Sequence, residues 1–227
     1  MTSVHGMPRR VEGRATAWLK AAGLSLALTS ITLTAWANPQ GGQVVAGKGS
    51  ISNPNGSTTL INQQSNKLVI DWSSFNVATG QTVQFSQPSI SAAALNRILD
   101  QSPSQIFGNL VSNGQVFLLN PNGIIFGRTA SVNTGALFAT SLGISNDDFM
   151  NGKLDFSAPA GEDGGPIVNH GLLQAVDGGS ISLVGGAVYN DGVIQANLGQ
   201  VDMVAGHAVT VDFDGDGLMQ FEVTQPV

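Results

Sequence analysis

Residues 168–175 read VNHGLLQA and residues 189–196 read YNDGVIQA, so the two segments match at an offset of 21 residues. A second pair, GSISLVGG (179–186) and GQVDMVAG (199–206), matches at an offset of 20, and a looser copy covers residues 108–118. Each copy contains a glycine, a short apolar pair, a turn, a second glycine and then alternating apolar residues. A repeat of this length is typical of a solenoid.

Each half of the repeat predicts a strand of about four residues whose side chains alternate between two faces. Such short strands bury too little surface alone, whereas stacked coils bury a continuous core. We therefore expect an all-β chain folded as a parallel β-helix, a single-stranded solenoid, and a right-handed one because parallel crossovers have that hand. A β-sandwich is the alternative. At 21 residues per coil, residues 38–227 predict roughly nine coils.

Three segments depart from the repeat. Residues 91–99 (SAAALNRIL) have a helix-forming composition. Residues 145–150 (SNDDFM) predict a helical turn in which Ser145 is the N-cap and an acidic residue follows three positions later. Residues 159–166 contain two prolines and three glycines, which predicts a loop.

The composition excludes several classes of protein. The chain has no cysteine, so it cannot hold disulfides or thiolate metal sites. It has 9 basic residues against 15 acidic ones, which argues against nucleic acid as a partner. It is 42% hydrophobic and only 11% charged, which is unlike a disordered chain.

The amino terminus has the pattern of a secretory signal peptide. Four basic residues within the first 20 positions precede the apolar run 21–33, and Ala35-Trp36-Ala37 follows as a small–x–small cleavage signature. We expect cleavage between Ala37 and Asn38, by signal peptidase after passage through the general secretory translocon. An uncleaved anchor is the alternative. Removal of residues 1–37 leaves five basic and fourteen acidic residues, a net charge of −9.

Several motifs in the mature chain carry a family resemblance. The sequence NPNGI (120–124) follows the expected strand 115–119 and precedes IFG (125–127), and DWSSFNV (71–77), VQF (83–85) and LNRI (95–98) lie upstream. In order and spacing these motifs resemble the amino-terminal secretion domain of two-partner secretion exoproteins. These are the filamentous-haemagglutinin-like proteins, and the resemblance is nearest to the high-molecular-weight adhesin branch. It covers residues from about 41 to 217.

The resemblance implies a right-handed β-helix with an amino-terminal cap, exported by a Gram-negative bacterium. It implies that residues 38–227 form a domain recognised by a dedicated outer-membrane transporter with periplasmic domains and a barrel. It also implies that the domain leads a longer secreted or cell-surface β-helical exoprotein, an adhesin, haemolysin or toxin carrier with a surface receptor. We expect further β-helical stalk after Val227, because no capping helix precedes that residue.

The resemblance assigns a role in secretion to the motif residues and to two residues of the upstream segment: Asn120, Pro121, Asn122, Gly123, Ile124, Asn96 and Arg97. The residues themselves predict a strong turn, because Pro121 presets φ and Gly123 accepts a conformation that other residues resist. Two interpretations stay open, a structural corner and a direct contact with the transporter. An earlier NPNG (53–56) has Gly in place of Leu and lies too early for the related family motif, so it predicts only a turn.

Catalytic and metal-binding motifs are sparse. Asp212, Asp214 and Asp216 have the spacing of a calcium loop, but the twelfth position is Val223 and not Glu. His170 and His207 occupy different phases of the repeat and predict surface or turn positions. The sequence contains no nucleophile motif and no glycine-rich phosphate loop. We expect a protein that is not an enzyme and needs no cofactor. The alternative is a free-standing carbohydrate-binding or carbohydrate-active β-helix.

Overall fold

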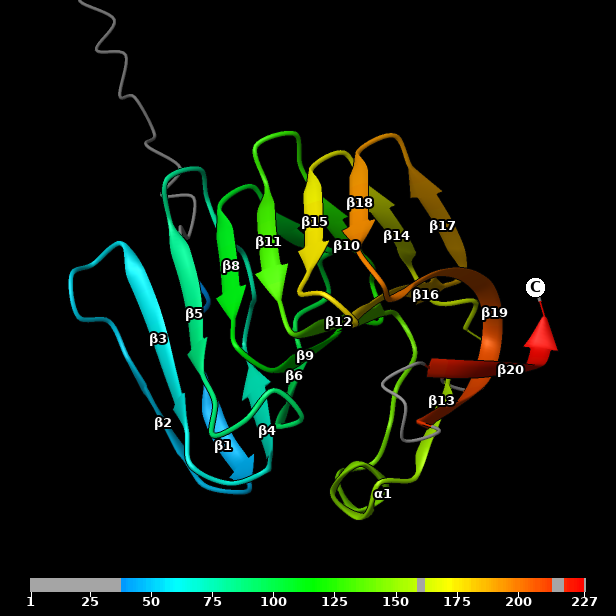
Figure 1. Ribbon diagram of the computed structural model, residues 1–227, viewed down its shortest axis with the longest axis horizontal. Helices are drawn as coiled ribbons and strands as arrows, with labels where there is room; N and C mark the ends of the chain where they lie inside the picture. Colours follow the sequence, from blue (N-terminus) through cyan, green and yellow to red (C-terminus); the bar gives the residue numbers. More distant parts are fainter. Residues whose placement is uncertain (1–37, 159–161, 214–218, 227) are drawn as a thin grey trace, which may run out of the picture. The chain divides into compact units, whose positions relative to one another are not determined.

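The computed structural model describes residues 38–158, 162–213 and 219–226. These residues form three sheets that make up the sides of a parallel β-solenoid (Figure 1). A complete coil passes through the seven-stranded sheet, then the nine-stranded sheet, then the four-stranded sheet. The predicted all-β solenoid is therefore confirmed.

The described strands fall into three sheets. The nine-stranded sheet contains β1 (Gln43–Ala46), β4 (Lys67–Trp72), β6 (Ala93–Ile98), β9 (Gln115–Leu119), β12 (Ala136–Thr140), β16 (Ser180–Gly185), β19 (Gln200–Phe213), β13 (Leu154–Ser157) and β20 (Met219–Pro226). The seven-stranded sheet contains β2 (Gly49–Ser52), β3 (Thr58–Gln63), β5 (Thr82–Ser86), β8 (Asn109–Ser112), β11 (Ser131–Thr134), β15 (Leu172–Ala175) and β18 (Val193–Ala196). The four-stranded sheet contains β7 (Ser104–Ile106), β10 (Ile124–Phe126), β14 (Pro166–Asn169) and β17 (Ala187–Asn190).

The repeat found in the sequence sets the register of the last coils. Val168 pairs with Tyr189 across β14 and β17, and Leu173 pairs with Ile194 across β15 and β18, in both cases at the offset of 21. Ile181 pairs with Val201 across β16 and β19 at the offset of 20. Residues that match in the sequence therefore stack directly on one another.

The solenoid has about seven turns, so the expectation of nine is wrong. Part of the chain leaves the coil rule. The strands β1 and β2 pair antiparallel with β4 and β3 and form the expected amino-terminal cap. Residues 142–158 and 162–165 belong to an excursion that contains the helix α1 (Asn146–Asn151) and β13, and residues 159–161 of the predicted loop lie outside the described residues. The second half of β19 pairs antiparallel with β13 and β20. The estimate of nine coils assumed that every residue from 38 to 227 lies in a coil of 21 residues, and these segments do not.

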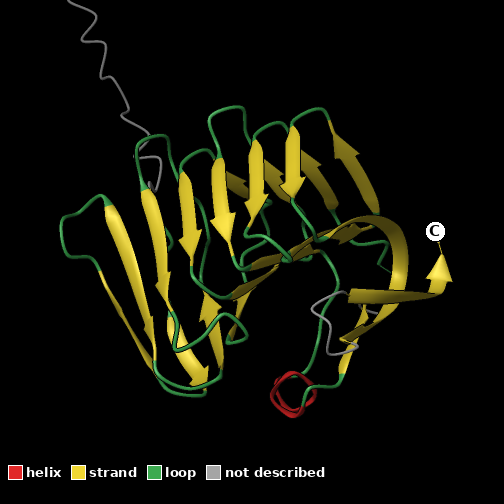
Figure 2. Ribbon diagram, viewed as in Figure 1, coloured by secondary structure: helices red, strands yellow, loops and turns green. Residues whose placement is uncertain are grey.

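The predicted helix over residues 91–99 is also wrong, because these residues form strand β6. This strand is hydrogen-bonded to β4 on one side and β9 on the other, and five of its six residues are buried. Burial on both faces outweighs the weak helical preference of the alanines. The capped turn at Ser145 is confirmed: its side chain accepts a hydrogen bond from the Asp148 N–H at 3.0 Å, and α1 is the only helix within the described residues (Figure 2).

The central strands β6, β9, β12 and β16 of the nine-stranded sheet are buried on both faces. In β9, Val116 and Leu118 point into the solenoid core, whereas Phe117 and Leu119 point outward into a second apolar cluster. The excursion covers that second cluster with aromatic side chains, among them Phe149 and Phe156. This explains why strands of this sheet read as nearly continuous apolar runs.

Two corners of the coil connect successive coils in different ways. The glycine corner joins the seven-stranded sheet to the nine-stranded sheet and contains Gly114, Gly135, Gly179 and Gly199. The amide corner joins β9 to β10 and contains residues 120–123.

Candidate functional site

The amide corner is a tight turn whose backbone leaves no space for other residues. The Gly123 N–H donates to the Asn120 carbonyl oxygen at 2.9 Å, and Gly123 has a φ of 103°, in the region that favours glycine. A Cβ on Gly123 would also meet the Pro166 carbonyl oxygen of the next coil at 2.5 Å. Glycine at this position is therefore required twice, by conformation and by packing.

The side chain of Asn120 joins this turn to the preceding coil. Asn120 is 0% exposed, and its Nδ2 donates to the Ser102 carbonyl oxygen at 2.9 Å and to Ser104 Oγ at 3.0 Å. Its Oδ1 accepts a hydrogen bond from the Asn122 N–H at 2.9 Å. One buried amide thus uses both its donor and its acceptor groups, as a buried polar group must.

The remaining motif residues extend the connection in both directions. Asn122 Nδ2 donates to the Asp100 carbonyl oxygen of the preceding coil at 2.9 Å. The Pro121 carbonyl oxygen accepts from the Gly165 N–H of the following coil at 2.7 Å. Ile124 is 0% exposed and lies in register with Ser104 and Ile167. The motif therefore connects three successive coils.

Asn96 lies elsewhere, inside the nine-stranded sheet. Its side chain is 0% exposed, accepts from Trp72 Nε1 at 3.0 Å and donates to the Ala94 and Phe117 carbonyl oxygens, each at 3.2 Å. This amide satisfies the indole of the neighbouring coil and fixes the register between β4, β6 and β9.

Arg97 follows Asn96 on the same strand and is partly exposed. Its guanidinium pairs with the Asp71 carboxylate through Nε at 2.9 Å and Nη2 at 3.0 Å to separate oxygens. The two side chains are 27% and 21% exposed, and the paired geometry is the strong bidentate one. Of the residues assigned a role in secretion, Arg97 is a surface group of the folded domain, whereas Asn96, Asn120, Gly123 and Ile124 are buried.

A buried amide network beside the glycine corner was not foreseen from the sequence. Gln87 Nε2 donates to Gln63 Oε1 at 2.9 Å and to the Ala92 carbonyl oxygen at 2.8 Å, and its Oε1 accepts from Ser112 Oγ. Three coils contribute to this network. Glutamine and serine at strand ends are too common for the residues alone to predict it.

The early NPNG sequence is a turn between β2 and β3, as predicted. Asn55 Oδ1 accepts from the Ser57 N–H at 3.1 Å, and Gly56 has a φ of 72°. Asn38 Nδ2 donates to the Gly56 carbonyl oxygen at 3.2 Å, so the first described residue lies against this turn. Ala37 and the rest of the predicted signal peptide lie outside the described residues, and the cleavage site stays a prediction.

The three aspartates with calcium-loop spacing, for which the sequence did not predict a metal site, lie largely outside the described residues. Asp214 and Asp216 lie outside the described residues, and Asp212 is described only as a backbone position in β19. Among the described residues, no three His, Asp or Glu side chains gather as a metal site would require. The two histidines lie apart, His170 against Asp191 and His207 Nδ1 at 3.8 Å from Asp163. No helix of the described residues is long and apolar enough to cross a membrane.

The fold and the amide corner define a class of protein, a β-solenoid domain with an amino-terminal cap. In this domain the residues of the NPNGI motif form hydrogen bonds and core contacts that connect the coils. Comparisons with known proteins agree with this class. The TPS secretion domain family matches residues 35–223. The crystal structure of the HMW1 secretion domain from Haemophilus influenzae has a TM-score of 0.76 and 35% sequence identity, and the match covers 84% of this chain and 50% of that one.

Two curated relatives are heme/hemopexin-binding proteins of Haemophilus influenzae. One is 35% identical over 181 residues, which is 76% of this chain and 19% of the relative. The other is 40% identical over 103 residues, which is 45% of this chain and 11% of the relative. The chain thus spans about a fifth or less of the length of these relatives.

The chain belongs to the TPS secretion domain family. It is the secretion domain of a two-partner secretion exoprotein, and the family is a non-catalytic targeting family. Exoproteins of this family are exported and become secreted or surface-associated, and the domain implies recognition by an outer-membrane transporter of the TpsB type.

Proposed function

We propose that residues 1–37 are a cleaved signal peptide and that residues 38–227 are the targeting domain at the head of a longer exoprotein. The general secretory translocon delivers the chain to the periplasm, where signal peptidase cuts after Ala37. The periplasmic domains of the cognate transporter then bind the chain, and its barrel conducts the chain to the outside. The match to the TPS secretion domain over residues 35–223 carries this proposal.

Recognition would use a chain that has not yet folded. An extended segment can add to a sheet edge of the partner, with main-chain hydrogen bonds providing affinity. The absence of cysteine suits such a chain, because no disulfide can lock it before export.

The motif residues would act mainly after translocation. Asn120 and Asn122 donate hydrogen bonds to the segment of residues 100–104. These bonds connect the coil formed by β8, β9 and β10 to the preceding coil, formed by β5, β6 and β7. Closing this corner would stabilise the first folded coils at the cell surface and disfavour return of the chain. In this view the motif affects secretion through folding, and its buried amides need not touch the transporter.

We propose that the exoprotein is an adhesin or haemagglutinin with a receptor on another surface. The alternative is a free-standing carbohydrate-binding or carbohydrate-active β-helix. A gene for an outer-membrane barrel with periplasmic domains beside this one, and further repeats after Val227, would favour the first.

Co-expression with that transporter tests the proposal. The chain is expressed with its signal peptide in a host that lacks related systems, with the transporter, without it, or with a transporter whose periplasmic domains are deleted. We expect the domain in the medium only with the intact transporter, starting at Asn38 by amino-terminal sequencing. Equal release in all three strains would contradict the proposal, and a different first residue would correct the cleavage site alone.

A further inference from the structure

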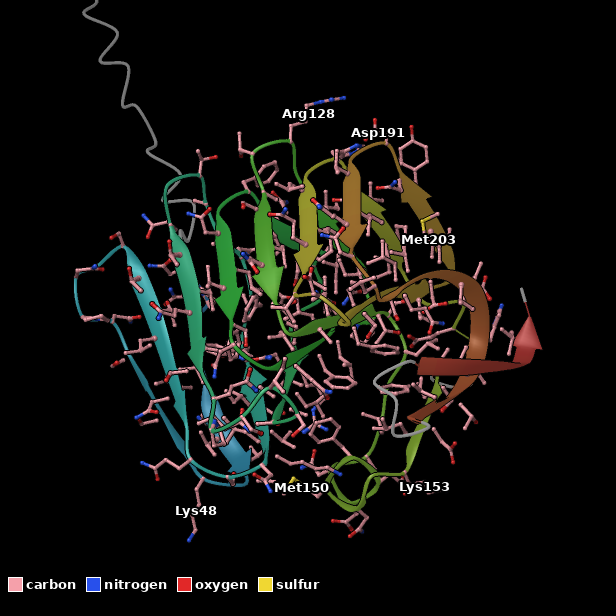
Figure 3. The ribbon with its side chains drawn as sticks, viewed as in Figure 1. Lys48, Arg128, Met150, Lys153, Asp191 and Met203 are labelled. Atoms are coloured by element: carbon pink, nitrogen blue, oxygen red, sulfur yellow. The ribbon has the colours of Figure 1, made fainter. Side chains whose placement is uncertain are left out.

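Two of the three solenoid faces carry no charge. None of the described strands of the seven-stranded and four-stranded sheets contains Asp, Glu, Lys or Arg, although residues 38–227 contain nineteen such residues. Charges lie on the nine-stranded sheet, on the excursion and at corners, such as Arg128 and Asp191, which Figure 3 shows on the loops at one rim. A charged ligand would find no ion pair on the two neutral faces.

The outer face of the four-stranded sheet is also apolar. Gln105, Ile125, Val168 and Tyr189 lie in register across the four strands and point outward, since the residues on either side of each are buried or partly buried in the core. Tyr189 is 55% exposed, and its ring meets the His170 ring edge-on at 5.9 Å. Phe107, directly after β7, is 36% exposed. An aromatic side chain therefore stands at each end of an aliphatic strip.

A polar groove of about 510 Å³ opens at the β7 end of this strip. Gln105 belongs to both, and Asn76, Asp100, Ser102, Ser73 and Gln40 also line the groove. The wall that contains Asp100 and Ser102 is the loop held by Asn120 and Asn122. The groove thus offers amides, hydroxyls and one carboxylate on a loop that the amide corner fixes in place.

The edge of β7 is closed to an added peptide strand. Val77 N–H donates to the Gln105 carbonyl oxygen at 2.9 Å, and Phe107 N–H donates to the Val77 carbonyl oxygen at 2.6 Å. The remaining donor, Gln105 N–H, is satisfied by Asn76 Oδ1 at 2.8 Å. An extended peptide that pairs with a free sheet edge has no free backbone groups to bind here.

We infer that the groove and the outer face of the four-stranded sheet bind a linear, uncharged glycan. A sugar ring has apolar C–H faces, which pack on aromatic and aliphatic side chains, and a rim of hydroxyls, which pair with amides and carboxylates. The strip supplies the first kind of contact and the groove the second. The strip and the lining of the groove include no Lys or Arg that could pair with an anionic saccharide, and the Asp100 carboxylate would repel one, so the site favours a neutral saccharide. This binding site goes beyond the proposed role in secretion and belongs to the folded, exported domain.

The test uses the purified domain, residues 38–227, with defined oligosaccharides. Cellohexaose, maltohexaose and the hexamer of N-acetylglucosamine are the neutral probes, and hexasaccharides of hyaluronan and heparin are the anionic ones. We expect calorimetry or ligand-observed NMR to detect at least one neutral probe and no anionic one. Tyr189→Ala and Asp100→Ala should each weaken that binding at least tenfold, and Tyr189→Phe should retain it.

Val193→Ala is the matched control, because Val193 is 57% exposed but lies on the seven-stranded sheet. It should bind as the unchanged domain does, and all variants should melt normally and be secreted normally. Binding to none of the neutral probes, binding to anionic probes alone, or equal loss in Val193→Ala would overturn the inference. So would a dimer that Tyr189→Ala abolishes without any saccharide binding, since the face would then be occupied by a second copy.

Discussion

At the glycine corner the coils stack through residues that have no side chain, whereas at the amide corner they are joined by asparagine side chains. The Gly135 N–H donates to the Gly114 carbonyl oxygen at 2.8 Å, and a Cβ on Gly135 would meet that oxygen at 2.7 Å. At the other corner, Asn120 fills the space between coils and uses its amide fully. An added side chain should therefore damage the first corner by crowding, whereas at Asn120 and Asn122 of the second corner the damage should come from the loss of specific hydrogen bonds.

The largest effect is expected from Gly179→Ala. A Cβ there would lie well inside contact distance of the Gly135 carbonyl oxygen, and neither backbone can move without disturbing its sheet. We expect a loss of about 3 kcal/mol in the free energy of unfolding, measured by urea denaturation. The neighbouring Gly178 is the control, since it has a φ of 79° but a Cβ added there would meet nothing within 4 Å. Gly178→Ala should cost only about 1 kcal/mol, and an equal cost at both positions would refute crowding as the cause.

Asn120→Ala should rank next. The change leaves the Ser102 carbonyl oxygen, Ser104 Oγ and the Asn122 N–H without their partner. The loss of these three hydrogen bonds, one buried and two partly buried, costs about 2 kcal/mol in total. This lowers the melting temperature by roughly 5 °C in a domain of this size. Asn133→Ala is the control, because Asn133 is an exposed position on β11. A normal melting temperature for Asn120→Ala would contradict the structural role of the corner.

Lys67→Met tests a region that belongs to neither corner. Lys67 Nζ donates to the carbonyl oxygens of Phe149 at 2.9 Å and Met150 at 3.2 Å and so caps the carboxyl end of α1, while burial lowers the pKa of the ammonium. The change should cost about 0.5 kcal/mol. Amides of residues 146–151 should exchange faster with deuterium while those of β9 and β12 do not. Faster exchange throughout would show that the excursion and the coils open together.

The smallest effect is expected from pH at Asp155. Hydrogen bonds from Thr210 and Lys153 hold the pKa of this carboxyl below its ordinary value of 3.8. Its small contribution is therefore present above that value and is lost as the pH falls through the lower pKa of the folded domain. Deuterium exchange of the amides that pair β13 with β19 should become faster in acid. In Asp155→Asn these amides should already exchange at that faster rate at neutral pH, and acid should not increase the rate further. An unaltered acid response in Asp155→Asn would assign the effect to another group.

Much of the solenoid could be predicted because its coils repeat. The match of residues 168–175 to 189–196 predicted the stacking of β14 on β17 and of β15 on β18. The helix predicted at 91–99 failed because the contacts that decide β6 come from β4 and β9, distant in sequence. The length of the excursion could not be predicted, because a segment that departs from the repeat has no period that the sequence would reveal.

The candidate site could be predicted only in part, because its turn depends on neighbouring residues and its other contacts do not. The turn at 120–124 is local, and proline, asparagine and glycine predict it directly. The partners of Asn120 in the loop 100–104 are long-range and follow no pattern in the sequence. Only the structure distinguishes a buried amide from an exposed one.

The most direct test measures secretion and folding on the same variants. Asn120→Ala, Asn122→Ala and Asn133→Ala are co-expressed with the cognate transporter, and the domain in the medium is quantified beside the melting temperature of each purified protein. We expect the first two variants to lose both stability and secretion, Asn120→Ala more than Asn122→Ala, and Asn133→Ala to lose neither. Normal secretion of Asn120→Ala despite a lowered melting temperature would contradict the claim that this corner promotes export by folding.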